Sequence, residues 1–252
     1  MTERLTDRGI PGWLRGVVDN MPADPMNINP VIERRAPQGA SSRAAAVLVL
    51  FGGAAMPEPN THGGLPVDAD ILLTQRASTM RQHRGQVAFP GGAADPGDDG
   101  PVGTALREAQ EETGLDPDGV RPLAILPEIF IPPSGFDVTP VIAYWEHPSP
   151  VSVVDPAEAE RVVRVPLGTL IAPENRFQVR HPAGYQGPAF SAEGMLVWGF
   201  TAGILAALLS VSGWELPWDV RDVRDLDDVL AAYDQDIVGD RRVYPEAPVV
   251  ES

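Results

Sequence analysis

The chain has 252 residues, with 35 Asp and Glu residues against 19 basic residues and a formal net charge of −16. Cysteine is absent, which excludes a disulfide framework, a thiolate nucleophile and a cysteine-ligated metal site. The acidic balance argues against nucleic-acid binding, because that binding depends on a basic stripe. The composition predicts a soluble globular protein that can bury its own core.

The first 40 residues predict an irregular N-terminal extension, because their prolines leave no room for a long helix. These prolines are Pro11, Pro22, Pro25, Pro30 and Pro37. The first residues mix acids with bases and lack an apolar run, so we expect no secretory signal and a cytoplasmic location.

Apolar runs of strand length, each bounded by turn residues, follow this extension. They occupy residues 44–51, 70–76, 86–90, 120–129, 138–146 and 161–167. Helices are predicted at 104–115, where Gly114 suits a C-cap, near 194–210, and at 224–236. The alternation predicts an α/β fold in which helices cover both faces of a mixed sheet.

Residues 194–213 carry no charge and are numerous enough to cross a bilayer. We favour a buried helix and no membrane contact, because the segment is rich in small residues and lacks flanking positive charge. The chain then becomes acidic, with eleven acids against four arginines in residues 214–252. We therefore divide the chain into an extension (1–40), a central domain (41–210) and an acidic C-terminal extension (211–252).

Three carboxylates gather on the helix predicted at 104–115. Glu108 is followed three and four residues later by Glu111 and Glu112, so all three project from one face within a single turn. Like charges at this spacing repel, and a divalent cation reverses that penalty. Oxygen ligands without cysteine favour Mg²⁺ or Mn²⁺. The alternative is an ordinary solvated acidic face.

The segment PGGAADPGDDGPVGTALREAQEETGL, at residues 90–115, resembles the Nudix box. Its second half, from Arg107 to Leu115, matches that pattern position for position. In the first half, direct counting puts Ala93 and Asp99 in the places of the box Gly and Glu. A loop longer by one residue puts Gly92 and Asp98 there. We favour this second register, because a glycine before the helix serves the backbone better than alanine.

Residues 72–92, LLTQRASTMRQHRGQVAFPGG, resemble the extended signature of one Nudix branch, the coenzyme A pyrophosphatases. The matching positions are Leu72, Leu73, Thr74, Arg76, Arg81, His83, Gly85, Val87, Phe89, Pro90, Gly91 and Gly92. Residues 134–144 and 194–205 also look like later elements of that branch. The resemblance spans roughly residues 41–210 and implies an α/β/α sandwich with a loop-helix-loop catalytic motif.

The resemblance implies that Glu108, Glu111 and Glu112 bind the metal ion, and that the enzyme splits coenzyme A into 4′-phosphopantetheine and adenosine 3′,5′-bisphosphate. It implies that Arg107 orients the glutamates. The residues themselves agree with a small phosphate-rich substrate, because the stretch from Ile71 to Val87 holds arginines and no acid. We assign substrate binding to five residues, namely Arg76, Arg81, Arg84, Gly91 and Gly92. For His83 we expect a structural hydrogen bond, and for Trp198 a place in the core.

The resemblance leaves the general base open between a box glutamate, Glu111, and a carboxylate on a later loop. On that loop we prefer Glu158 to Glu160, although Glu158 also suits a helix N-terminus. Two alternative functions stay open. One is a Nudix pyrophosphatase for a nucleoside diphosphate sugar, a dinucleotide or an oxidised nucleotide, and the other is a non-catalytic nucleotide sensor. The sequence is compatible with a homodimer.

Overall fold

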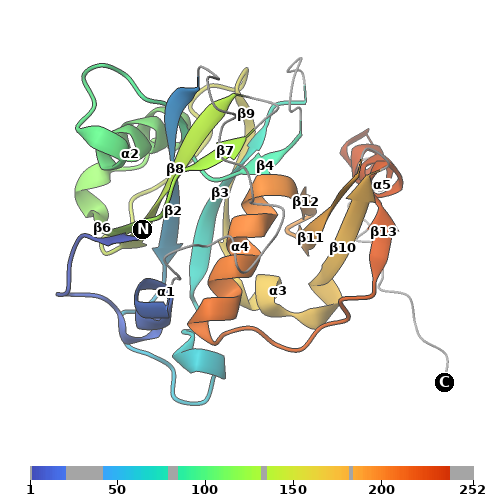
Figure 1. Cartoon of the computed structure of the whole chain (residues 1–252), viewed down its shortest axis with the longest axis horizontal. Helices are drawn as coiled ribbons and strands as arrows, with labels where there is room; N and C mark the ends of the chain where they lie inside the picture. Colours follow the sequence, from blue (N-terminus) through green and yellow to red (C-terminus); the bar gives the residue numbers. More distant parts are fainter. Residues whose placement is uncertain (1, 21–41, 79–84, 132–134, 182–183, 239–252) are drawn as a thin grey trace.

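The computed structural model describes residues 2–20, 42–78, 85–131, 135–181 and 184–238 (Figure 1). Within these residues, nine strands form a mixed sheet in the order β1-β6-β8-β2-β3-β4, with β5 paired to β2, β7 to β8 and β9 to β3. The strands are β1 (Glu3–Arg4), β2 (Arg43–Gly52), β3 (Asp70–Arg76), β4 (Val87–Ala88), β5 (Gly91–Ala93), β6 (Val120–Ile125), β7 (Ile129–Ile131), β8 (Phe136–Trp145) and β9 (Ala159–Pro166).

The central strands are apolar on both faces, because helices cover the sheet on both sides. Along β2, Leu48 and Leu50 face one buried cluster, whereas Val49 and Phe51 face the other. Successive side chains of a strand point to opposite faces, so a continuous apolar run is what a sheet buried on both faces requires. β2 and β8 are parallel over nine residue pairs, and the other strand pairs of this sheet are antiparallel.

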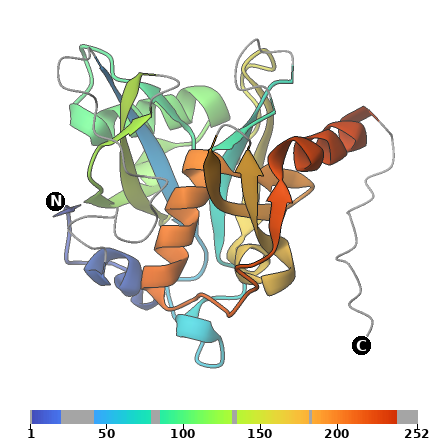
Figure 2. The same cartoon turned by 45° about the vertical axis from the view of Figure 1, so that its right-hand side comes forward.

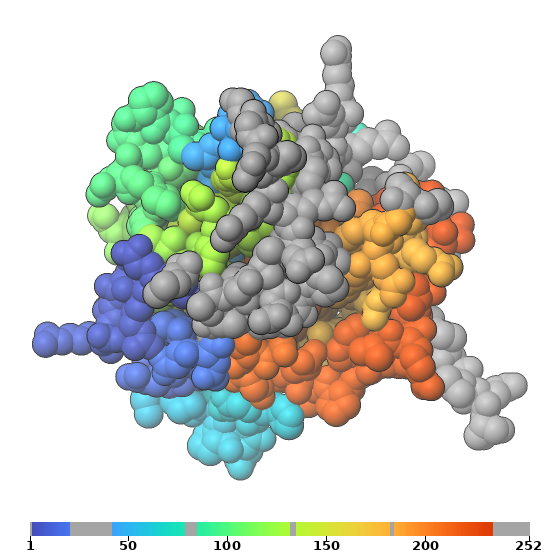
Figure 3. Space-filling model, viewed as in Figure 1, coloured from blue at the N-terminus to red at the C-terminus, as the bar shows by residue number. Residues whose placement is uncertain are grey.

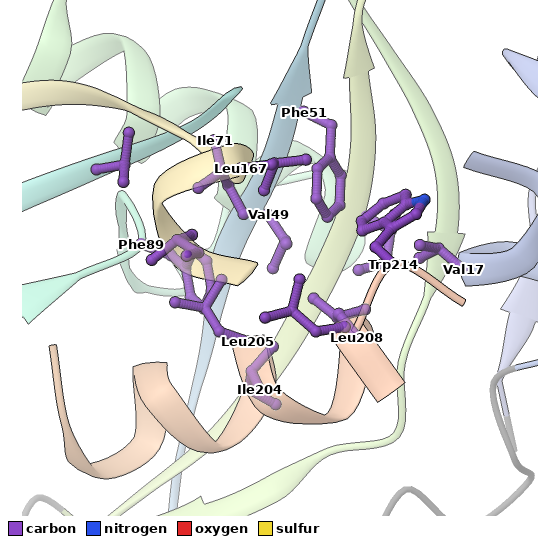
Figure 4. Packing of buried hydrophobic residues seen from close by; sticks show 14 of the residues in the cluster. Val17, Val49, Phe51, Ile71, Phe89, Leu167, Ile204, Leu205, Leu208 and Trp214 are labelled. Carbon is purple, nitrogen blue, oxygen red and sulfur yellow. The ribbon is translucent and has the colours of Figure 1, made fainter. Parts of the chain in front are cut away.

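Helix α2 (Gly100–Thr113) covers one face of this sheet, and α4 (Gly199–Ser212) covers the other together with the short α1 (Arg15–Asn20) (Figure 1). Figure 4 shows the core on the α4 side, where Leu205 and Leu208 point from the helix toward the side of the sheet that carries Val49. The result is the predicted α/β arrangement with a mixed sheet between helices.

A second sheet of four strands, in the order β12-β11-β10-β13, packs beside the first. Its strands are β10 (Arg176–His181), β11 (Tyr185–Ala192), β12 (Met195–Val197) and β13 (Val223–Asp225). Helix α5 (Leu226–Val238) covers it on the side away from α2 (Figure 2). The remaining helical segments are α3 (Leu167–Ile171) and the 3-10 turns η1 (Gly12–Leu14), η4 (His62–Gly64), η5 (Pro117–Gly119) and η6 (Pro173–Asn175).

The described N-terminal residues are part of the main core. Trp13, Leu14 and Val17 are buried there, and the Trp13 ring lies 5.5 Å from that of Trp214, centroid to centroid. Figure 3 shows the blue N-terminal residues against the orange residues of the α4 region. These contacts describe how the flanking segments pack, and the division of the chain at residues 40 and 210 stays a prediction.

The structure confirms the expected strands at 44–51, 70–76, 86–90, 138–146 and 161–167, with small shifts of their ends. The expected strand at 120–129 is divided into β6 and the beginning of β7. The helix expected from residue 194 begins only at Gly199, because Met195–Val197 form β12. Within the described residues, no helix is both long and apolar enough to span a membrane.

Candidate functional site

The acidic residues expected at the site lie on α2, whose ends the sequence sets clearly. Pro101 occupies the first turn, where its missing N–H costs nothing. Gly114 ends the helix in a left-handed conformation, φ 71°, and its N–H donates to Gln110 O at 2.9 Å. Ala105 and Ala109 pack on the sheet. At about 100° per residue, Glu112 and Glu108 lie at the edge of this packed face, and Glu111 lies on the opposite side of the helix.

Arg107 organises the acidic groups around the beginning of α2. Its Nε and Nη2 donate to the two carboxylate oxygens of Asp98 at 2.8 and 3.0 Å. Its Nη1 donates to Glu108 at 2.9 Å and Glu111 at 3.1 Å, and Nη2 also donates to Ala93 O at 2.9 Å. The same contacts hold the pKa of the Asp98 carboxyl well below its ordinary value, chiefly through the hydrogen bond from Arg107. Arg107 thus positions two of the three glutamates.

These contacts favour the register with Gly92 and Asp98 in the box positions. A Cβ at Gly92 would lie 2.4 Å from Glu108 Oε2, so only glycine leaves room for that carboxylate. Asp98 binds Arg107 through both oxygens, and Oδ2 also accepts from Thr104 Oγ1 at 2.8 Å. Asp99, the other candidate, precedes the helix without a side-chain capping bond.

Glu112 lies in a different environment from its two neighbours. Its Oε2 accepts a hydrogen bond from Gly91 N at 3.3 Å. Burial raises the pKa of the Glu112 carboxyl to about 7, and the negative charges of Glu108 and Glu158 act in the same direction, against the Gly91 hydrogen bond and the positive charge of Arg76. Burial is also the main reason why the pKa of the Glu108 carboxyl is raised. Burial therefore disfavours the charged forms of both carboxylates, although Glu108 has Arg107 as an ion-pair partner.

The three glutamates do not converge on one point. In the part of the chain that the structure describes, no three His, Asp or Glu side chains lie close enough together to hold a metal ion. Glu111 is 60% exposed and bound to Arg107, whereas Glu108 is 18% exposed. Glu108 and Glu112 thus adjoin the Gly91–Gly92 backbone, and Glu111 lies on the outer side of the helix.

Two charged residues from other elements act on Glu112: Arg76, the last residue of β3, and Glu158, which directly precedes β9. Arg76 ends β3 opposite Ala159 of β9, at a register shift between Gln75 and Arg76. Ala77 N donates to Glu158 O at 3.0 Å, which fixes the backbone before β9. The charges of both Arg76 and Glu158 reach Glu112. Among the described residues, the buried Nε of Arg76 has no hydrogen-bond partner, so this guanidinium keeps a donor for a ligand.

The remaining expected residues divide into two groups. Arg81, Arg84 and His83 lie outside the described residues. Glu158 and Glu160 are exposed at the beginning of β9, where a turn replaces the helix start that Glu158 also suited. Glu160 Oε2 accepts from Ser78 N at 3.3 Å. Glu160 therefore has a backbone partner, and Glu158 is the acid whose charge reaches Glu112.

The sequence did not predict that α4 and the second sheet contact β4 and β9 near the site. Thr201 Oγ1, in the first turn of α4, donates to Val87 O of β4 at 3.0 Å. Arg161 of β9 donates to Glu193 O, in the turn between β11 and β12, at 2.9 Å. The sequence predicted a helix near 194–210; Gly194 is a turn signal that could have indicated a hairpin there, but it carries no sign that the hairpin adjoins β9. Trp198, expected in the core, is half-buried and packs against the core of the second sheet.

A family model described as the NUDIX domain matches residues 59–181. The chain is 36% identical over 175 residues to the Nudix hydrolase NudL of Cronobacter sakazakii, which is 67% of this chain and 82% of that protein. It is 36% identical over 145 residues to NudL of Escherichia coli O7:K1, 55% of this chain and 72% of that protein. The structure of a NUDIX hydrolase from Alicyclobacillus acidocaldarius is similar with a TM-score of 0.43 and 19% identity, over 69% of this chain and 94% of that one.

Proposed function

The chain belongs to the Nudix hydrolase family, and from that membership we propose that it hydrolyses the diphosphate bond of coenzyme A or its acyl derivatives. The products are 4′-phosphopantetheine and adenosine 3′,5′-bisphosphate. One observation carries the proposal beyond the family activity on nucleoside diphosphate derivatives. Arg76, in the segment that resembles the coenzyme A branch, comes within electrostatic reach of Glu112 beside Gly91.

Nudix hydrolases use divalent metal ions, and the donor atoms here suit Mg²⁺ or Mn²⁺, because they are carboxylate oxygens. The missing side chain of Gly92 leaves space for the Glu108 carboxylate, and Glu112 lies one residue away at Gly91. We assign the ion to Glu108 and Glu112, with Glu111 as a third ligand after it leaves Arg107. When bound, the ion neutralises the diphosphate and activates water.

Arg76 and the two glycines form the diphosphate side of the proposed site. A guanidinium binds phosphate oxygens bidentately, and Arg76 has an unused buried Nε. A Cβ at Gly91, φ 156°, would lie 2.3 Å from Ala46 O and 2.6 Å from Val47 Cα, so the glycine allows β5 to pack closely on β2. Arg81 and Arg84 belong to the same proposed set of phosphate-binding residues. Together these arginines offset the net charge of −16, which otherwise repels the substrate.

For the general base we propose Glu158, with Glu111 as the alternative. Glu158 is exposed just before β9, and its negative charge is one of the causes that raise the pKa of Glu112, which supports a place for Glu158 near the proposed metal carboxylates. Glu111 already accepts a hydrogen bond from Arg107. We expect Glu158→Gln to lower kcat about 100-fold, because a general base contributes roughly 10²–10⁴-fold. Glu160→Gln, at an acid held by Ser78 N, is the matched control and should leave kcat unchanged.

The experiment that tests the substrate is product analysis by mass after incubation of the purified chain with coenzyme A and Mg²⁺ or Mn²⁺. We expect 4′-phosphopantetheine and adenosine 3′,5′-bisphosphate in equal amounts. A panel of nucleoside diphosphate sugars, dinucleotides and oxidised nucleotides is the comparison. A tenfold or greater preference for a diphosphate that lacks pantetheine overturns the coenzyme A proposal and leaves another Nudix pyrophosphatase.

The metal assignment has its own test in Glu112→Gln. The change keeps the size of the side chain and removes its charge, so we expect kcat to fall about 100-fold or more, in keeping with the loss of a metal ligand. Glu174→Gln, at an exposed acid of η6 outside the site, is the matched control. Unchanged turnover in Glu112→Gln contradicts catalysis through a metal ion at Glu112, whereas absence of turnover in the unmodified chain favours a non-catalytic nucleotide sensor.

A further inference from the structure

The first residues of β2 and β8 carry an arginine and an aromatic ring that the proposed diphosphate site does not use. Arg43 and Phe136 are direct partners in the parallel register of these strands. The guanidinium carbon of Arg43 lies 4.2 Å from the centroid of the Phe136 ring. This stack restricts a long, flexible side chain to one orientation at the end of the sheet.

Arg43 keeps its hydrogen-bonding donors available. Its side chain is exposed, and no carboxylate of the described residues forms an ion pair with it, in a chain with 35 acids against 19 arginines. A guanidinium that lies flat on a ring presents its N–H groups in the plane of the stack, where a phosphate is bound bidentately. Arg43 is therefore an oriented cation that fits an anionic ligand.

Arg43 lies on the same strand as the residues that flank the diphosphate glycines. Side chains two residues apart share a face of a strand, so Arg43, Ala45 and Val47 are on one face of β2. Val47 is paired with Gly91, and a Cβ at Gly91 would lie 2.9 Å from Val47 Cγ1, on that face. Gly91 therefore adjoins the face that carries Arg43.

The residues between these two points on β2 and β5 have small side chains. Ala45 and its partner Ala93 contribute only methyl groups. Ala46, the partner of Gly92, comes three positions after Arg43 on β2. Three positions correspond to about 10 Å along a strand. In Figure 1 the beginning of β2 lies at the top of the view, beside the loop that leads into α2. A substrate group has to span about this length of β2 to extend from the glycines to Arg43.

We propose that Arg43, held flat on Phe136, binds a phosphate monoester of the substrate that lies outside the diphosphate being cleaved. This proposal rests on the proposed function, since coenzyme A carries a 3′-phosphate on the ribose whose 5′-oxygen bears the diphosphate. Arg43 then selects coenzyme A over 3′-dephospho-coenzyme A, which has the same diphosphate and the same pantetheine arm. In this proposal the Arg43 side chain alone determines the specificity for the 3′-phosphate.

The test compares kcat/KM for coenzyme A and 3′-dephospho-coenzyme A in the unmodified chain and in Arg43→Ala. We expect Arg43→Ala to lower kcat/KM for coenzyme A about tenfold or more, mainly through KM, because a hydrogen-bonded charge pair is lost. For 3′-dephospho-coenzyme A we expect a change of less than about twofold. Arg8→Ala, which removes an exposed arginine of the N-terminal segment, is the control for net charge.

A second measurement does not depend on turnover. Calorimetric titration of the metal-free chain with adenosine 3′,5′-bisphosphate and with adenosine 5′-monophosphate should show tighter binding of the bisphosphate, and Arg43→Ala should abolish the difference. Phe136→Leu should give an intermediate loss, because the guanidinium stays but loses its orientation. If Arg43→Ala lowers the thermal midpoint, Arg43→Gln, which keeps the stem of the side chain, replaces it in both measurements.

The outcomes separate this proposal from the function on which it rests. If the unmodified chain cleaves both substrates equally well, or if Arg43→Ala weakens both equally, the selection by Arg43 is wrong while the coenzyme A activity stands. If the chain cleaves neither substrate but Arg43→Ala still abolishes the preference for the bisphosphate, the proposed substrate is wrong and Arg43 is a phosphate-binding residue for another ligand.

Discussion

Replacing Gly92 with alanine separates the chemistry of the site from the stability of the fold. The new Cβ would lie 2.4 Å from Glu108 Oε2, 2.5 Å from Cδ and 2.7 Å from Oε1, closer than real Cβ atoms approach other atoms. All three contacts are with the end of a flexible side chain, so Glu108 moves away and the backbone stays. We expect the Mn²⁺ affinity and kcat/KM to fall about 10–100-fold, the usual effect of disturbing a metal ligand. The free energy of unfolding should change by less than about 1 kcal/mol.

Two neighbouring glycines are the controls. At Gly91, φ 156°, a Cβ would lie 2.3 Å from Ala46 O and 2.6 Å from Val47 Cα, which are backbone atoms. Gly91→Ala should therefore cost about 2–5 kcal/mol of stability through strain and overpacking. At Gly97 a Cβ would meet nothing within 4 Å, so Gly97→Ala should change neither property. The assays are thermal unfolding, calorimetric titration with Mn²⁺, and turnover of coenzyme A. Full Mn²⁺ affinity in Gly92→Ala, or unfolding as severe as in Gly91→Ala, would refute the reasoning.

Three further predictions follow from the contacts around α2 and α4. Arg107→Lys keeps the charge but loses the bidentate contact with Asp98, so thermal unfolding should occur at a lower temperature and Mn²⁺ affinity should fall about tenfold or more. The Arg107 hydrogen bond lowers the pKa of the Asp98 carboxyl in the folded chain, so its stabilisation is complete above the unfolded pKa of about 4 and is lost at lower pH. Urea midpoints should therefore differ between the unmodified chain and Asp98→Asn at pH 7, and the difference should shrink below about pH 4. Tyr185→Phe removes the hydroxyl that accepts the Gly199 N–H at 3.1 Å, which should cost about 1 kcal/mol in urea unfolding and leave turnover unchanged.

The central sheet and α2 could be predicted from the sequence because their signals are local. Leu48 to Phe51 form an apolar run that only a sheet buried on both faces uses. Gly114 marks the end of α2 by a conformation that favours glycine. The spacing of Glu108, Glu111 and Glu112 places all three on one helix, as the structure has them, but Glu111 lies on the outer side of α2 and the three do not converge in the described residues.

The sequence did not predict the second sheet, because β11 contains residues that are typical of turns. β11 contains Gly187 and Pro188, which are rare inside strands. Only alternate residues of β10, Phe177 and Val179, belong to the core under α5. Two apolar residues are too few to predict a strand from the sequence alone. A half-buried strand such as β10 is stabilised by a partner strand and a helix that lie far along the chain.

The N-terminal segment shows the same limit for packing. Within the described residues 2–20, α1 is only six residues long, but no proline there reveals that Trp13 is 2% exposed. The reason for its burial lies some 200 residues away in sequence, where Trp214 and the end of α4 offer an aromatic surface. The Trp13 ring also meets Phe51 of β2 edge to face, with centroids 6.3 Å apart. Long-range aromatic contacts of this kind have no local signal.

The spacing of the three glutamates did not predict that they have different hydrogen-bond partners. A helix turn brings Glu108, Glu111 and Glu112 together, but Arg107 binds the first two. Glu112 has the Gly91 N–H as its donor, and burial raises the pKa of its carboxyl to about 7. A divalent cation at Glu112 and Glu108 would supply the positive charge that Arg107 supplies on the outer side of the helix. Glu112, beside Gly91, is therefore the acid whose charged form the chain stabilises least, and this supports the proposed metal site.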